Sequence, residues 1–453
     1  MQSSTLQFEL NENQTIAYFY PPEEKWEKKL NGFEHFYSTM FPVAAFYFQG
    51  EIQIDRFIDA MAKTLEDFPM MFARLRTTSD GSYAEFSGFK NDKEKYKIQL
   101  EISEQNVNVE EGILENILPN YVDQKIKQGI VDDTNNLPMG AFRITKFENG
   151  FSLGYYINHA FFDQSSILYF FKYLSDIYTN GTTTHPKPFL IDVATLKPKI
   201  PPSFKNLTEI RDYSKTVGMR YVNDINELYQ LLTTPYPGTI FNLVFNRDQL
   251  EKFRNENDLK VSANDIIQAV LFKIYSYDKN LTDEDNIYFA FPCNLKKRCG
   301  FNENGIGNVI TGCQSFFRVG DLRNASLTEL AKKSRERVDQ INTETFKENL
   351  VWFESLLSMG ESPQKYLPTA FFEPLYFGAS NWASFNYETV NFDDNTPFAL
   401  KTTSIPTLGI SIICFSGGKE LEYTLSIAVP HNSTDSLYLL EKTSHLFSIN
   451  LEK

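Results

Sequence analysis

The sequence predicts an α/β protein of two domains, each a mixed β-sheet packed with helices. Its 453 residues exceed the roughly 250–300 at which a single hydrophobic core stops growing. A proline-rich stretch at residues 185–203 cannot be an interior helix or strand, because proline fixes φ and donates no backbone hydrogen bond. Strand and helix patterns alternate on both sides of it. We therefore expect an N-terminal domain at residues 1–184, a crossover at 185–215 and a C-terminal domain at 216–453.

The first half carries a helix, a buried strand and a second helix. Apolar residues recur at helical spacing over Ile54–Phe68, and Pro69 ends the pattern. The run Phe151–Ile157 is typical of a buried strand. It leads into a helix expected at Ser165–Tyr178, whose apolar side chains share one face.

The second half repeats this alternation. A helix is expected at Ser262–Tyr275, and a charge-rich amphipathic helix at Leu327–Ile341. Gly409–Phe415 and Leu421–Ile427 are predicted to be neighbouring strands, and Ser436–Phe447 a closing helix.

Composition excludes several classes of function. The net charge of −14 disfavours nucleic acid and anionic membrane surfaces as partners, because the field of the whole chain repels them. The N-terminal 20 residues lack the layout of a signal peptide, and no apolar run is long enough to span a bilayer. Four cysteines without CxxC spacing indicate neither a disulfide scaffold nor a zinc site. We expect a soluble, cytoplasmic protein with no metal.

Several common catalytic motifs are missing. The chain has no GxxxxGK[ST], HExxH or GxSxG motif and no acidic EF-hand loop. Gly305 and Gly307 begin like a dinucleotide-binding loop, but Ile310 stands where the third glycine must be. The sequence therefore gives no support to three classes of function: phosphate-loop nucleotide chemistry, zinc proteolysis and serine hydrolysis.

One histidine stands out from the other four. His159 follows the strand Phe151–Ile157, and Asp163 lies at the start of the next helix. A side chain at such a strand end can point into a cleft, and the apolar residues 160–162 would keep its imidazole neutral and able to accept a proton. On spacing alone a second interpretation stays open, in which Asp163 only caps the helix and His159 fills the strand end.

Six separated segments add support in the order of one known family: Phe68–Leu75, His159–Asp163, Val261–Asp265, Cys293–Arg298, Gly307–Asn308 and Ser380–Phe392. In turn they resemble the YPLAGRL, HxxxD, VSTND, VDxRxR, GN and SSW…YEADF motifs of the BAHD acyltransferases, which move acyl groups from coenzyme A thioesters. The resemblance covers about residues 30–430. It implies the chloramphenicol acetyltransferase-like fold, with an active-site tunnel between two domains.

The resemblance also implies a mechanism and its residues. An acyl-CoA co-substrate and an alcohol or amine acceptor would meet at His159, the general base, with no permanently bound cofactor. Asp163 would hold the loop by pairing with Lys296 or Arg298. Ser380 and Trp382 are the expected substrate or oxyanion residues; the alternative for Ser380 is a strand-end hydroxyl.

Coenzyme A carries phosphates, so an acidic chain needs local positive charge to bind it. The densest basic run near a family motif is Lys296, Lys297 and Arg298, and Ser262 begins a helix that could offer backbone N–H groups. The alternative for such a run is a solvated surface.

Departures from the family pattern indicate a divergent member. Gln164 replaces the glycine that usually follows the motif aspartate, and Asn294 and Lys296 replace two residues of VDxRxR. The DFGWGKP segment survives at 391–397 only as its Phe and Pro.

Two other functions remain open. A free-standing relative of condensation domains would take acyl groups from a carrier protein, but it normally has a second histidine where this chain has Asn158. A non-catalytic binding protein of the same fold would have been free to lose His159 and Asp163. The family interpretation further implies a monomer acting in secondary metabolism on small molecules.

Overall fold

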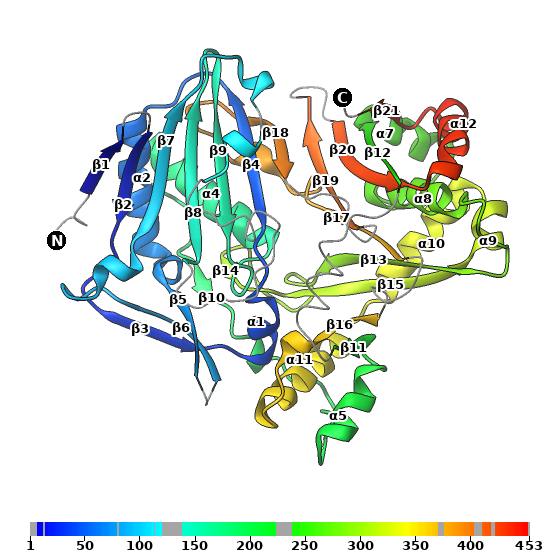
Figure 1. Cartoon of the computed structure of the whole chain (residues 1–453), viewed down its shortest axis with the longest axis horizontal. Helices are drawn as coiled ribbons and strands as arrows, with labels where there is room; N and C mark the ends of the chain where they lie inside the picture. The colour runs from blue at the N-terminus through cyan, green and yellow to red at the C-terminus, as the bar shows by residue number, and fades with distance from the viewer. Residues whose placement is uncertain are drawn as a thin grey trace.

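One large mixed sheet runs through the whole molecule (Figure 1). A computed structural model describes residues 7–11, 14–78, 81–112, 114–119, 138–222, 238–369, 376–402, 410–417 and 422–451. In spatial order the main path of the sheet is β1 (Gln7–Asn11), β2 (Gln14–Phe19), β7 (Ile98–Glu104), β8 (Gly140–Lys146), β9 (Gly150–Ile157), β4 (Val43–Gln49), β18 (Pro397–Thr402), β19 (Ile410–Ser416), β17 (Tyr376–Asn381), β13 (Asn286–Asn294) and β15 (Ile310–Arg318). Three further strands continue it from β19: β20 (Glu422–Val429), β12 (Thr239–Asn246) and β21 (Ser448–Leu451).

The N-terminal half packs two helices against its part of the sheet. Both α2 (Ile54–Asp67) and α4 (Gln164–Asn180) bury one apolar face in the main core. A separate three-stranded sheet adjoins this core; it consists of β3 (Lys25–Lys29), β6 (Gly81–Ser87) and β5 (Arg74–Thr78). These are the faces expected from the 3.6-residue period of the sequence.

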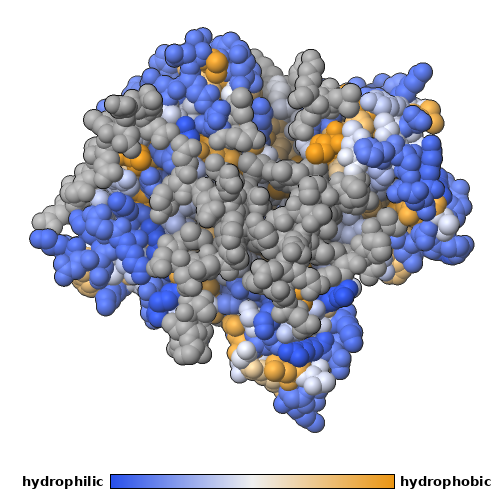
Figure 2. Space-filling model, viewed as in Figure 1, coloured by the Kyte–Doolittle hydropathy of each residue, from blue (hydrophilic) through white to orange (hydrophobic). Residues whose placement is uncertain are grey.

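The C-terminal half is built around α8 (Ala263–Ser276), which is buried over nearly its whole length. Its amphipathic neighbour α10 (Leu327–Gln340) packs along it, and the outer side of α10 is hydrophilic. Three more helices of this half are α7 (Arg247–Glu256), α9 (Val319–Asn324) and α12 (Thr434–Ser444). Figure 2 shows a largely hydrophilic surface over this part of the molecule.

A smaller cluster lies at the lower edge of the view in Figure 1. It joins α1 (Gly32–Tyr37) of the N-terminal half to α11 (Thr343–Ser358) and α5 (Leu207–Ser214). Three capping hydrogen bonds fix the start of α1, where Asn31 and Glu34 form a capping box. The cluster has its own apolar core, which is continuous with the pocket described below. Two short strand pairs lie near it: β10 (Phe189–Leu190) with β14 (Gly305–Ile306), and β11 (Met219–Tyr221) with β16 (Tyr366–Pro368).

The two halves meet in a shared strand pair. β18 belongs to the C-terminal half by sequence, yet it pairs antiparallel with β4, with Leu400 opposite Phe46. Because β4 also pairs with β9, the strand that precedes His159, the sheet is continuous from the first half to the second.

The helices expected from periodicity are present within a few residues of their expected ends. The helix expected at Ile54–Phe68 spans Ile54–Asp67, and a 3₁₀ turn begins at Pro69. The strand expected at Gly409–Phe415 begins at Ile410, and Gly409 lies outside the described residues. Leu421, the expected start of the next strand, also lies outside them. The expected crossover at 185–215 contains β10 and α5.

Candidate active site

His159 lies in the turn between β9 and α4, and hydrogen bonds to Met40 and Ser38 fix the backbone of this turn. Its N–H donates to the carbonyl of Met40 at 2.8 Å. The preceding Asn158 donates from its side chain to the carbonyl of Ser38 and accepts from the N–H of Ala160, each at 2.8 Å. Asn158 therefore shapes the turn and attaches it to the segment after α1.

The imidazole of His159 is oriented by Asn308, which comes from the other half of the chain. Nδ2 of Asn308 donates to the carbonyls of His159 and Ala160, which fixes the orientation of the amide. Its Oδ1 lies 3.0 Å from Nδ1 of His159, so Nδ1 must carry the proton. Nε2 is then the nitrogen with the free lone pair, the one a general base needs.

Burial sets the protonation state of His159. It lowers the pKa of the imidazole below its ordinary value, although the charge of Asp163 and the hydrogen bonds that the ring donates to its own backbone and to Asn308 oppose the shift. The ring lies against Tyr37, with 4.7 Å between centroids. The site therefore holds a neutral histidine near pH 7.

Asp163 is the N-cap of α4. Among the described residues, no hydrogen bond joins its carboxylate to the imidazole of His159. Its Oδ1 accepts from the backbone N–H and hydroxyl of Ser166, from Ser165 and from Nζ of Lys296, at 2.8–2.9 Å. Burial on its own raises the pKa of Asp163, but the Lys296 charge and these hydrogen bonds outweigh it and hold the pKa below its ordinary value. The carboxylate of Asp163 thus caps α4 and also fixes the position of the loop that carries His159.

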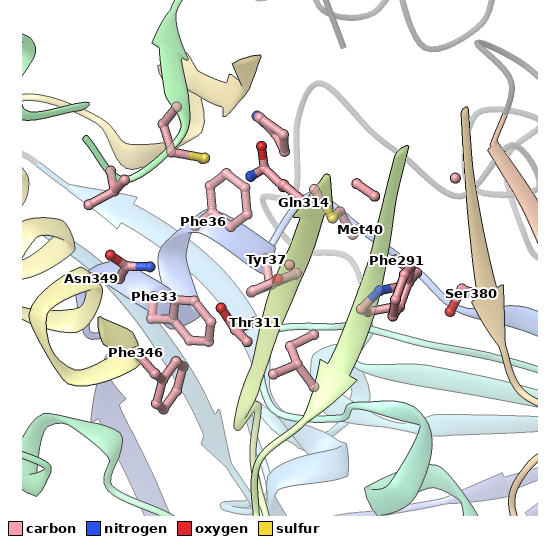
Figure 3. A pocket seen from close by; sticks show the side chains of 18 of the residues that line it. Phe33, Phe36, Tyr37, Met40, Phe291, Thr311, Gln314, Phe346, Asn349 and Ser380 are labelled. Carbon is pink, nitrogen blue, oxygen red and sulfur yellow. The ribbon is translucent and has the colours of Figure 1, made fainter. Parts of the chain in front are cut away.

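A cavity of about 330 Å³ opens beside His159, between the two halves. Its wall is mostly aromatic and aliphatic. Figure 3 shows Phe33, Phe36 and Phe346 at one end, Thr311 and Gln314 along its middle, and Ser380 at the other end. The small-molecule pockets of enzymes have this form: apolar, concave and carrying a few polar groups.

Ser380 and Trp382, expected from one motif, have different positions. Ser380 lies near the end of β17 and lines the same cavity as His159. Trp382 is buried, and its backbone N–H donates to the carbonyl of Ile413. It is not among the described residues that line the cavity.

The residues expected to bind coenzyme A are also separated by the structure. Lys296 is buried, and its Nζ donates to Asp163 and Ser166 at 2.9 and 2.7 Å, so this ammonium does not face solvent. Arg298 donates to the carbonyls of Val338 and Ile341 at the end of α10. Lys297 is exposed.

Ser262 lies at the start of α8 as expected, but polar groups at this helix start already form hydrogen bonds within the protein. Its side chain accepts from the N–H of Asp265, and Asp265 accepts in return from the N–H and hydroxyl of Ser262. Asn381 donates to Asn264 at 3.0 Å, which brings this helix start beside the end of β17. The Asp265 carboxylate therefore already places a negative charge at the start of α8.

The sequence did not predict the role of Asn308. It also did not predict that α11 lines the cavity. The GN resemblance marked Asn308 as a position but said nothing of its contact with a histidine 149 residues away. In the described part of the chain, no group of three or more His, Cys, Asp or Glu side chains is arranged to hold a metal. No helix there is long and apolar enough to cross a membrane.

Solved structures share this fold over nearly the whole chain. TRI101 of F. sporotrichioides, crystallised with coenzyme A and T-2, is 13% identical with a TM-score of 0.69, covering 93% of this chain and 99% of its own. TRI101 of F. graminearum, in a complex with coenzyme A and deoxynivalenol, is 11% identical with a TM-score of 0.68, covering 94% and 99%. Vinorine synthase is 12% identical with a TM-score of 0.62, covering 98% of each chain. The expected two-domain acyltransferase fold is thereby confirmed.

No curated protein sequence matches the chain. The model of the Transferase family does, over residues 48–432. That range includes the HxxxD motif, Asn308 and Ser380, and it spans most of the sequence. The chain therefore belongs to the Transferase family of BAHD acyltransferases.

Proposed function

We propose that this enzyme transfers an acyl group from an acyl-CoA thioester to a hydroxyl or amine of a small molecule, with His159 as the general base. The observation that carries the proposal is the neutral His159, anchored through Nδ1 to Asn308 beside an apolar cavity. The coenzyme A and small-molecule complexes of the TRI101 structures support the same pair of substrates.

The reaction needs no covalent enzyme intermediate. Nε2 of His159 takes the acceptor's proton while its oxygen or nitrogen attacks the thioester carbonyl carbon. The tetrahedral oxyanion collapses, the C–S bond breaks, and the proton passes from His159 to the coenzyme A thiolate. The products are an ester or amide and free coenzyme A. A general base contributes about 10²–10⁴ in rate, and positioning of the two substrates supplies much of the rest.

Two further roles are part of the proposal. Ser380 shares the cavity with His159, so its hydroxyl can donate to the developing oxyanion. Lys297 is exposed beside the buried Lys296, and we assign it a contact with a coenzyme A phosphate. If Lys297 makes this contact, Lys297→Ala should raise the KM for acyl-CoA and leave kcat unchanged.

The decisive experiment measures release of coenzyme A with a thiol reagent, using acetyl-CoA and longer acyl-CoAs with a panel of alcohols and amines. His159→Ala should lower turnover by about 10²–10⁴ while the melting temperature stays within a few degrees. His185→Ala, a histidine in the crossover, is the matched control and should keep full turnover. Retained turnover in His159→Ala would refute the mechanism. A carrier-protein thioester used in preference to every acyl-CoA would favour the condensation-domain alternative.

A further inference from the structure

The cavity beside His159 has an uncharged wall. Among the described residues that line it, none is Asp, Glu, Lys or Arg. The carboxylate of the motif, Asp163, does not line the cavity, and its Oδ1 already accepts from Ser165, Ser166 and Lys296. A cationic ligand would therefore lose its hydration without gaining a counter-ion from the described wall.

The aromatic rings at the end of the wall that holds Phe33, Phe36 and Phe346 are poorly placed to replace that counter-ion. Cations bind over the open face of an aromatic ring. Here the rings pack edge to face: Phe33 with Tyr37 at 5.0 Å and 77°, Phe36 with Tyr37 at 4.9 Å and 86°, and Phe33 with Phe346 at 5.6 Å and 80°. In such pairs the edge of one ring covers the face of the next. The cluster suits an apolar ligand body better than an ammonium group.

Besides Thr311, Gln314 and Ser380, which line other parts of the cavity, α11 adds a polar side chain among these rings. Phe346, Asn349 and Phe353 follow one another at i, i+3 and i+7, so α11 presents them on one face. Phe346 and Phe353 are buried, and Oδ1 of Asn349 is buried without a hydrogen-bond partner among the described residues. Figure 3 shows Asn349 beside Phe33 and Phe346, at the end of the cavity away from Ser380.

Asn349 is half-buried as a residue, but a buried carbonyl oxygen without a partner costs free energy, and an apolar residue would fill the same helix position at less cost. Asn349 lines the cavity, so a rotation of its side chain would bring the amide into contact with a bound ligand. The position is therefore better explained by a ligand contact than by packing of α11.

We propose that the acceptor of this enzyme is a neutral hydroxyl compound with a compact apolar body, and that the amide of Asn349 is a specificity-determining contact to it. The inference rests on the proposed acyl transfer and narrows its acceptor from alcohol or amine to alcohol. At pH 7.4 only about one alkylamine molecule in a thousand is neutral, whereas an alcohol needs no counter-ion. The volume of about 330 Å³ lies at the lower end of ligand pockets, which run roughly 300–1,000 Å³.

The test uses two probes of equal shape, 2-phenylethanol and 2-phenylethylamine, with the full-length protein. Binding is measured by calorimetry at pH 6.4, 7.4 and 8.4. The Kd of the alcohol should be the same at all three values. The Kd of the amine should be at least tenfold weaker at pH 7.4 and should improve about tenfold per pH unit, because only its neutral form enters.

Two variants of nearly equal size then test the residue. Asn349→Asp places a carboxylate in the wall and should weaken alcohol binding at least tenfold while strengthening amine binding at pH 7.4 at least tenfold. Asn349→Leu removes the amide without adding charge, so it should weaken the alcohol and leave the amine weak. With acetyl-CoA as donor, the kcat/KM values for the alcohol and the amine should change in the same directions in each variant.

An amine that binds at pH 7.4 as tightly as the alcohol would overturn the inference, and so would an Asn349→Asp variant with an unchanged preference. If Asn349→Asp does not fold, the pH series on the unmodified protein still decides. Absence of coenzyme A release with every acyl-CoA would refute the proposed function, while the binding series would still decide the acceptor class.

Discussion

Nζ of Lys296 lies 2.9 Å from Oδ1 of Asp163, and both side chains are buried. The ion pair connects the first turn of α4 with the segment after β13, so it fastens the turn that carries His159 to the other half of the chain. Ser166 completes it, because its hydroxyl lies 2.7 Å from Nζ and 2.8 Å from Oδ1. Buried charges are tolerated when they are paired and hydrogen-bonded in this way.

Replacing the cation should destabilise the fold. Lys296→Met leaves the Asp163 carboxylate buried without its partner, and we expect a loss of about 3–5 kcal/mol in the free energy of unfolding, measured by urea denaturation. Lys297→Met is the matched control, because Lys297 is exposed, and should change stability by at most about 0.5 kcal/mol. Equal effects of the two substitutions would contradict a structural role for the pair.

Replacing the carboxylate tests the role of Asp163 from the other side. Asp163→Asn leaves the Lys296 charge uncompensated and weakens the cap of α4, so soluble yield, stability and activity should fall together, with a stability loss of about 3 kcal/mol. Yield, denaturation and coenzyme A release are measured on one preparation. Unchanged folding with only an altered pH dependence would show that Asp163 acts on the proton transfer instead.

Asn308 should affect the rate more than the affinity. Asn308→Ala removes the acceptor for Nδ1 of His159, and kcat should fall by about 10–100-fold, the equivalent of one or two hydrogen bonds. The KM for acyl-CoA should change little. Because the contact with Asn308 raises the pKa of His159, the acidic limb of the rate profile should also move to lower pH. Asn304→Ala, which removes a hydrogen bond to Lys187 at the exposed end of the same segment, should show neither effect.

The pH dependence of the unmodified enzyme follows from the environment of His159. Burial lowers the pKa of the imidazole from its ordinary value of 6.5, so the base form persists below pH 6.5. The acidic limb of kcat/KM profiles from pH 5 to 8 should therefore have its midpoint below pH 6.5. A midpoint at or above 6.5 would mean that the ring is not buried when the substrates arrive. The same shift makes stability fall with decreasing pH in this window, because the unfolded chain binds the proton more tightly.

Local signals in the sequence predicted five of the ten α-helices in the described residues and marked His159 and Asp163 as candidate site residues. The apolar period of residues 54–68 and the proline after it fixed both ends of α2 to within one residue. His159 and Asp163 lie four positions apart on one turn, so a short motif contains both of them. Ser262 could be expected to cap α8 from its position alone.

Contacts between distant segments could not be predicted in this way. The Asn308 contact spans 149 residues, and no periodicity records it. The basic run at 296–298 appears uniform in sequence, yet the structure buries Lys296, directs Arg298 to α10 and leaves Lys297 exposed. Which face of α11 lines the cavity likewise depends on its packing against α1 and not on its own pattern.

The pairing of β18 with β4 has a consequence for motion. A cleft between two separate domains can open by a hinge, but here the main-chain hydrogen bonds of a shared strand pair would have to break first. Substrates and products must therefore come and go through movements of loops and side chains around a rigid frame. Heat or denaturant should likewise melt both halves together, in a single cooperative transition.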